Sequence, residues 1–209
     1  MKPFKNLVFD IGNVIIDIDY SLPQAEFQKL ATVDFTGKIS YSHQVKVFDL
    51  FEMGAISSAQ FRTELRKFLK PDVTDAEIDY AWNCMITAYP KHKFTLLKNL
   101  MPNYQTYFLS NINEIHIDLI DSEVQKQFGA TSMAEYVHVA YYSNLIKLRK
   151  PAIEIYNYLL QKEQINPAET FFVDDKLENI EAAKQAGIQA YHLADRDKLE
   201  DLLMELNIL

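Results

Sequence analysis

The chain alternates between short apolar runs and segments whose apolar residues recur at helical spacing. Its first apolar run, Leu7-Val8-Phe9, contains no polar residue and stops at Asp10. Uninterrupted runs of this kind are typical of central parallel strands, because both faces of such strands are covered. The pattern therefore predicts a buried strand that delivers a carboxylate at its end.

Between about residues 17 and 89 the pattern changes to that of amphipathic helices. Ser57 with Gln60, and Thr74 with Glu77, have the spacing of a capping box, in which two side chains satisfy the free N–H groups at a helix start. Apolar residues at helical spacing follow both pairs. They are Phe61, Leu65, Phe68 and Leu69 after the first pair, and Ile78, Trp82, Met85 and Ile86 after the second. We predict a small helical bundle over 17–89.

From residue 90 onward, helical and strand patterns alternate. The predicted strands are 105–109, 136–142, 170–173 and 188–193, and the predicted helices are 94–100, 114–124, 152–160 and 178–186. Pro151 suits a first helical position, and Gly187 suits a left-handed cap. The alternation predicts an α/β fold, a doubly wound parallel sheet with right-handed crossovers. We expect a core domain of residues 1–16 and 90–209, with residues 17–89 inserted as an alpha-helical cap domain.

Composition limits the classes of partner. The 209 residues are 48% hydrophobic, enough for a substantial core, and the formal net charge is −8. Binders of nucleic acid or of anionic membranes need clustered Lys and Arg, so we expect neither partner and favour a small-molecule substrate. The N-terminal residues do not resemble a secretion signal and no apolar run approaches membrane-spanning length, so a cytoplasmic protein is expected. The oligomeric state is left open.

Polar residues stand where several predicted strands end, and another precedes a helix. They are Asp10, Ser110 and Asn111, Lys150, and Asp174 and Asp175. One Asp at a strand end commonly turns the chain, but in a parallel sheet all these strand ends lie along one edge, where such sheets bind ligands. Carboxylates brought together repel, so a cation is expected between them. Oxygen ligands without His or Cys favour Mg²⁺ over zinc.

In the order of these motifs the chain resembles the haloacid dehalogenase (HAD) superfamily over nearly its whole length. The motifs are Phe9-Asp10-Ile11-Gly12-Asn13-Val14, Leu109-Ser110-Asn111, Arg149-Lys150-Pro151, and Phe172-Val173-Asp174-Asp175 with Asn179 and Gly187 following. The helical segment falls where the subgroup with an inserted alpha-helical cap carries it. Within that subgroup, the amino-acid sequences of these motifs are most similar to those of glucose-1-phosphate phosphatase-type members.

The resemblance implies a Mg²⁺-dependent phosphatase for a small phosphorylated metabolite, of which a sugar phosphate is one candidate. Asp10 would be the nucleophile and form an aspartyl-phosphate that water hydrolyses. Mg²⁺ would be held by Asp10, the backbone carbonyl of Gly12 and Asp175, with Asp174 close by, directly or through water. Ser110 and the amides around Asn111 would donate to the phosphoryl oxygens, Lys150 would neutralise charge, and Asn179 would orient the acids.

The chain departs from the family pattern at Gly12. Most phosphatases of the superfamily carry a second Asp there as general acid and base, a function worth ~10²–10⁴-fold in rate. Without this Asp, three outcomes are open: hydrolysis is slow, the substrates have good leaving groups, or another acidic residue of the chain supplies the proton. Asp17 and Asp19 are candidates by proximity in sequence only, with turn or linker roles as the alternative.

Three functions therefore stay open: a phosphatase, a haloacid dehalogenase without metal, and a weakly catalytic HAD-like binding or regulatory protein. The pair Asp174 and Asp175 argues against the dehalogenase, because two added acids without a cation would only repel. The cap is expected to set substrate choice. Phe51 and Glu52 stand before Met53-Gly54, where a helix end would present side chains, but the pattern does not rank them.

Overall fold

A five-stranded parallel sheet forms the centre of the larger part of the molecule. The computed structural model describes residues 4–36 and 46–209. The strands follow the order β5-β4-β1-β6-β7, and every neighbouring pair is parallel. They are β1 (Asn6–Phe9), β4 (Gln105–Ser110), β5 (Val139–Tyr142), β6 (Thr170–Asp174) and β7 (Gln189–His192). The predicted α/β fold with a doubly wound parallel sheet is confirmed.

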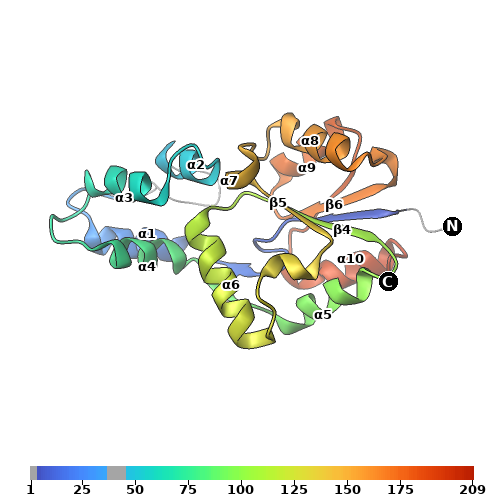
Figure 1. Cartoon of the computed structure of the whole chain (residues 1–209), viewed down its shortest axis with the longest axis horizontal. Coiled ribbons are helices and arrows are strands. Elements are labelled where there is room, and N and C mark those ends of the chain that lie inside the picture. Colours follow the sequence, from blue (N-terminus) through green and yellow to red (C-terminus); the bar gives the residue numbers. More distant parts are fainter. Residues whose placement is uncertain (1–3, 37–45) are drawn as a thin grey trace.

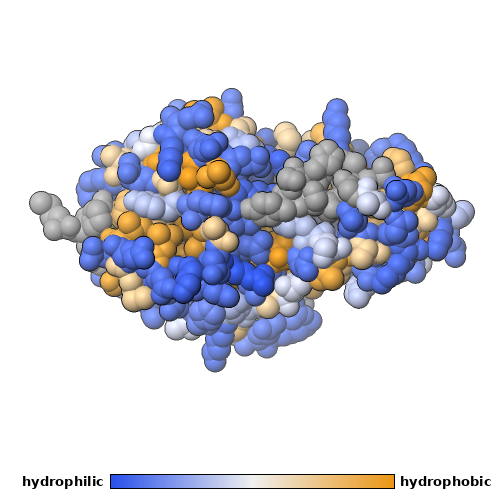
Figure 2. All heavy atoms as spheres, turned by 180° about the vertical axis from the view of Figure 1, so that it is seen from behind, coloured by the Kyte–Doolittle hydropathy of each residue, from blue (hydrophilic) through white to orange (hydrophobic). Residues whose placement is uncertain are grey.

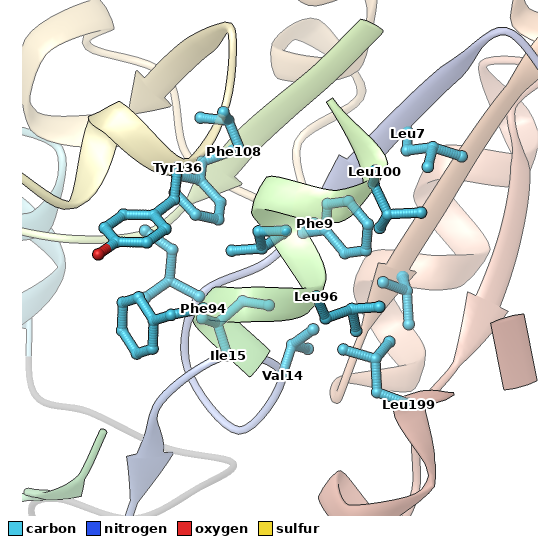
Figure 3. Close-up of a cluster of buried hydrophobic side chains, with 14 of the residues drawn as sticks. Leu7, Phe9, Val14, Ile15, Phe94, Leu96, Leu100, Phe108, Tyr136 and Leu199 are labelled. Atoms are coloured by element: carbon cyan, nitrogen blue, oxygen red, sulfur yellow. The ribbon is translucent and has the colours of Figure 1, made fainter. Parts of the chain in front are cut away.

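Helices cover both faces of this sheet (Figure 1). Leu7 and Phe9 of β1 point to the face covered by α5 (Lys91–Leu100), α6 (Glu114–Phe128) and α10 (Leu199–Glu205). Val8 points to the opposite face, which packs against α8 (Ile153–Glu163) and α9 (Leu177–Gln185). Figure 3 shows the first of these clusters, where β1 residues meet Leu96 and Leu100. Burial on both faces explains why the apolar run before Asp10 shows no alternation.

In the described part of the inserted segment, four helices surround an aromatic core of their own. They are α1 (Ser21–Leu30), α2 (Lys46–Glu52), α3 (Ser58–Arg66) and α4 (Asp75–Asn83), and they lie beside the sheet in Figure 1. Both predicted capping boxes are present, at the starts of α3 and α4. The ring centroids of Phe51 and Phe61 are 4.2 Å apart and those of Phe48 and Trp82 are 4.6 Å apart. Aromatic rings bury a large apolar surface, and they make contact throughout this core.

A two-stranded antiparallel sheet joins this segment to the rest of the chain. β2 (Asp17–Ile18) pairs with β3 (Ile86–Ala88), so the prediction of helices alone over 17–89 is wrong at both ends. α4 ends at Asn83, and Met85 instead accepts a hydrogen bond from the Asp19 N–H at 2.8 Å. β2 and β3, where the chain enters and leaves the inserted segment, form hydrogen bonds between their backbone groups. Helical spacing in the sequence does not reveal such a long-range pairing.

Two further predictions need correction. Pro151 does not begin a helix: it follows a cis peptide bond from Lys150, and α8 starts at Ile153. The strand predicted from 136 begins only at Val139, because Met133–Tyr136 forms a short 3-10 helix capped by Ser132. Gly187 has the expected left-handed backbone, with φ 84°.

A mostly polar surface is expected for a chain in which 24% of the residues are charged. The face shown in Figure 2 is mostly hydrophilic, with small hydrophobic patches between polar regions. Among the described residues, no helix has both the length and the apolar character needed to cross a bilayer.

Candidate active site

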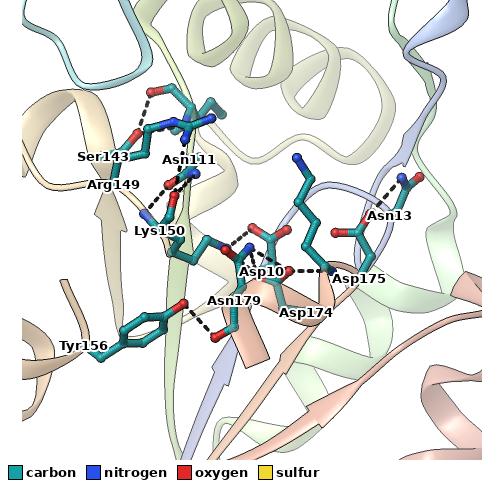
Figure 4. A network of polar contacts seen from close by, with 12 residues as sticks. Asp10, Asn13, Asn111, Ser143, Arg149, Lys150, Tyr156, Asp174, Asp175 and Asn179 are labelled. Carbon is teal, nitrogen blue, oxygen red and sulfur yellow. Dashed lines mark hydrogen bonds and ion pairs between the residues drawn. The ribbon is translucent and has the colours of Figure 1, made fainter. Parts of the chain in front are cut away.

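The carboxyl edge of the sheet opens into a pocket that gathers almost every residue selected from the sequence. Asp10 directly follows β1, Ser110 ends β4, and Asp175 directly follows β6. The candidate site residues that line the pocket are Asp10, Gly12, Ser110, Asn111, Lys150, Asp175 and Asn179. Asp174 lies beneath them, fully buried at the end of β6. Figure 4 shows how the side chains of Asp10, Lys150, Asp174, Asp175 and Asn179 converge.

Lys150 joins two of the acids. Its Nζ lies 2.8 Å from Oδ1 of Asp10 and 2.6 Å from Oδ2 of Asp174, and the side chain is almost completely buried. Burial alone would lower the pKa of Lys150, but the two carboxylates outweigh it and raise the pKa. The lysine therefore remains an ammonium group in the buried site.

Asp174 is held by protein groups on both of its oxygens. Oδ1 accepts from the backbone N–H of Lys176 at 2.8 Å and from Nδ2 of Asn179 at 2.9 Å. Oδ2 accepts from Lys150 and, at 3.0 Å, from the same Asn179 amide. The backbone carbonyl of Asn179 in turn accepts from the hydroxyl of Tyr156 at 2.9 Å. These contacts fix the place of Asp174 and, through it, that of Lys150.

The site holds more negative than positive charge. Asp10, Asp174 and Asp175 each place a carboxylate oxygen within 4.8 Å of the others. Burial, with added repulsion from Asp10 and Asp174, raises the pKa of Asp175 to about 7. Burial also raises the pKa of Asp10, although Lys150 opposes the shift. A close set of oxygen donors with uncompensated negative charge fits a hard divalent cation such as Mg²⁺.

Asn13, which the sequence analysis did not select, positions Asp175. Its backbone is left-handed with φ 54°, a conformation that Asn tolerates better than most residues. Nδ2 donates to Oδ2 of Asp175 at 3.0 Å, while Oδ1 accepts from the backbone N–H of Ile18 at 3.0 Å. A Cβ atom at position 12 would lie 2.6 Å from Cδ1 of Ile18, so any larger residue there would require the Ile18 side chain to move.

Asn111 contacts the backbone of Lys150. Its side-chain amide donates to the Lys150 carbonyl and its Oδ1 accepts from the Lys150 N–H, each at 2.9 Å. This pair of bonds fastens the segment that carries Lys150 to the end of β4. The side chain of Asn111 thereby supports the segment that carries the lysine.

The inserted segment also contributes residues to the lining of the pocket. They are Ile18, Tyr20, Glu52 and Ile86. Glu52, which the sequence did not rank, is buried, and its Oε2 accepts from Nε of Arg149 at 2.9 Å. Pairs separated by about a hundred positions give no signal in one sequence, so only the fold reveals this one.

The other candidates named with these residues lie outside the pocket lining. Phe51 stacks on Phe61 in the core of the inserted segment. Asp17 lies 4.0 Å from the ammonium of Lys93 and 3.8 Å from Nε of Arg196. Asp19 accepts hydrogen bonds from Ser21 at the start of α1. The two acids hold the linker between the sheet and the inserted helices.

The comparisons with known proteins agree with this geometry. The family model for haloacid dehalogenase-like hydrolases matches residues 4–187, and the chain belongs to that family. It is similar to D-ribitol-5-phosphate phosphatase from Bacteroides thetaiotaomicron, with 30% identity over 187 residues that cover 90% of each chain.

Solved structures extend the comparison. A HAD family enzyme from Bacteroides thetaiotaomicron, determined with magnesium and inorganic phosphate, has a TM-score of 0.81 and 33% identity, covering 90% of this chain and 93% of that one. A HAD-like hydrolase from Porphyromonas gingivalis has a TM-score of 0.89 at 23% identity, covering 98% of both chains, and shows the shared fold.

Proposed function

We propose that the chain is a Mg²⁺-dependent phosphatase that acts on a small phosphorylated metabolite, with sugar and polyol phosphates as the favoured class. The observation that carries this proposal is the buried Asp10, paired with Lys150 and set beside Asp175 in one pocket. The similarity to a D-ribitol-5-phosphate phosphatase and to an enzyme determined with magnesium and phosphate supports both the reaction and the cofactor.

Asp10 is the proposed nucleophile. Its carboxylate attacks phosphorus, the bond from phosphorus to the substrate oxygen breaks, and water then hydrolyses the aspartyl-phosphate. Phosphoryl transfer depends mainly on positioning and on stabilising charge. Lys150 and Ser110, with the backbone amides around Asn111, stabilise the charge on the transferred group. Asp174 and Asn179 keep Lys150 in place through the hydrogen bonds described above.

The proposed Mg²⁺ ligands are Asp10, the backbone carbonyl of Gly12, and Asp175, with Asp174 close by. When bound, the ion neutralises the charge that would otherwise keep a phosphate away from these carboxylates. Asn13 keeps Asp175 turned toward the site. Since both oxygens of Asp174 accept from protein donors, we assign this residue to positioning Lys150 rather than to direct coordination.

We also propose that residues 17–89 act as a cap over a core of residues 1–16 and 90–209. Tyr20 and Glu52 come from the inserted segment and line the same pocket as Asp10, so the segment covers the reacting group. Covering the site excludes water during phosphoryl transfer and places cap residues against the leaving group.

Removal of divalent ions is expected to stop hydrolysis. After treatment with EDTA, the release of phosphate from para-nitrophenyl phosphate and from D-ribitol 5-phosphate should fall to background, and added Mg²⁺ should restore it. A parallel assay with a 2-haloacid should give no halide with or without metal. Halide release in EDTA would instead indicate a dehalogenase, and inactivity in every assay would indicate a binding or regulatory protein.

The affinity for Mg²⁺ is expected to weaken as the pH falls. Asp175 has a pKa raised to about 7, so below this pH a proton occupies the carboxylate that the ion needs. Each pH unit below the pKa should raise the apparent Kd about tenfold, since the ion must displace one proton. Isothermal titration of metal-free protein at several pH values measures this slope. An affinity that stays constant below about pH 6 would contradict the assignment of Asp175 as a ligand.

A further inference from the structure

A phosphatase that acts on sugar or polyol phosphates must supply a proton to its leaving group. The oxygen released from such a substrate is an alkoxide, which is a very poor leaving group unless it is protonated as its bond to phosphorus breaks. Gly12 carries no side chain, and neither Asp17 nor Asp19 lines the pocket. The donor must therefore come from the other groups that line the pocket.

Most of these groups are unsuited to the task. His116 has contacts at both ring nitrogens, 3.1 Å from the Asn113 amide and 3.3 Å from the Trp82 carbonyl, and burial lowers its pKa to about 4. Burial and the nearby acids raise the pKa of Tyr20 well above its usual value. Arg149 stays charged in proteins, and Lys150 is held between two carboxylates.

Glu52 differs from these four residues in its contacts and its position. It ends α2, is 7% exposed, and lines the same pocket as Asp10. Its Oε2 is occupied by Arg149, while its Oε1 has no hydrogen-bond partner among the residues that the structure describes. The backbone carbonyl of Glu52 accepts from the hydroxyl of Ser143, which fixes the end of the helix against the core.

The surroundings of Glu52 suit a group that gains and loses a proton. Arg149 faces it from the core and Asp49 lies one turn earlier on α2, with Nη2 of Arg149 3.1 Å from Asp49. Lys176 precedes α9, and Tyr20 lies on the cap side of the pocket. Burial raises the pKa of Glu52, and the attraction of Arg149 offsets this only in part.

We propose that Glu52 is the general acid and base of the reaction, acting from the cap in place of a carboxylate at position 12. This inference rests on the proposed phosphatase function. As Asp10 forms its bond to phosphorus, the bond to the leaving oxygen breaks and the proton of Glu52 moves to that oxygen, releasing an alcohol. Glu52, now a carboxylate paired with Arg149, then takes a proton from water as the water oxygen attacks the aspartyl-phosphate. Phosphate and free Asp10 are released, and Glu52 is again protonated.

The test compares Glu52→Gln with the unmodified protein on two substrates of similar size, phenyl phosphate and para-nitrophenyl phosphate. Nitrophenolate leaves without a proton, whereas phenolate benefits from one. The ratio of kcat/KM for phenyl phosphate to that for para-nitrophenyl phosphate should fall at least about tenfold in the variant. For D-ribitol 5-phosphate, kcat/KM should fall about 10²-fold or more, and the decrease in kcat/KM at alkaline pH should disappear.

Asp49→Asn is the matched control, because Asp49 binds the same Arg149 from the same helix but does not line the pocket. Its substrate ratio should match that of the unmodified protein, and circular dichroism should show that both variants are folded. An equal loss on both substrates in Glu52→Gln, or the same change of ratio in Asp49→Asn, would show that Glu52 only holds the cap and would overturn the proposal. An unmodified protein inactive on every phosphate ester would instead overturn the phosphatase function itself.

Discussion

Asp10→Asn is expected to lower kcat for any phosphate ester by at least about 10³-fold while leaving the melting temperature unchanged or higher. Asparagine has the shape of aspartate but cannot form the acyl-phosphate. Burial and Asp174 raise the pKa of Asp10, which means that the ionised carboxylate destabilises the fold near neutral pH. Lys150 keeps its ion pair with Asp174 in the variant, so the loss of one partner does not leave the ammonium unpaired.

Phosphate release and thermal unfolding of the same preparation measure the two effects. Asp19→Asn is the control, because this acid lies on the linker and contacts Ser21 rather than the pocket. It should retain the activity of the unmodified protein. Turnover by Asp10→Asn at more than a tenth of the original rate would show that another group attacks phosphorus.

The part of the site that lies on the sheet could be predicted from local patterns. Apolar runs specify buried strands, strands alternating with helices specify a parallel sheet, and a parallel sheet brings the residues after its strands to one edge. Asp10, Ser110 and the pair Asp174 and Asp175 follow from these three steps alone. Which of the two adjacent acids faces the pocket did not follow, because that depends on whether β6 includes Asp174, as it does here.

The remaining contacts depend on residues far apart in the chain. Glu52 and Arg149 meet only because α2 packs against the core. β2 and β3 form a pair although almost the whole inserted segment separates them in the sequence. Asn13 is close to Asp10 in the sequence, but its role in the site is to donate a hydrogen bond to Asp175, which depends on the turn after Asp10. Local periodicity contains no information on such pairs, so the part of the pocket that the inserted segment lines could be identified only from the three-dimensional structure.

Lys150→Met is expected to be both inactive and markedly less stable. Removing one partner of a buried ion pair typically costs about 3–5 kcal/mol, because the opposite charge stays buried without compensation. Here two carboxylates, Asp10 and Asp174, lose their shared ammonium group. Methionine fills the space of the lysine stem, so the cost reflects charge rather than a cavity.

The loss of stability should depend on pH in a defined direction. Without Lys150 the pKa of Asp10 rises further, because Lys150 is the main group that lowers it. When the pKa of a carboxyl group is higher in the folded protein than in the unfolded chain, the folded protein binds more protons. The free energy of unfolding therefore decreases as the pH increases. The deficit of Lys150→Met relative to the unmodified protein should therefore be large at about pH 8 and small at about pH 5. Urea unfolding in EDTA at both pH values measures it, and adding Asp174→Asn to the variant should recover part of the stability at the higher pH. A deficit of equal size at both pH values, with no recovery in the double variant, would mean that Lys150 stabilises the fold through packing and does not act as the counter-charge of the site.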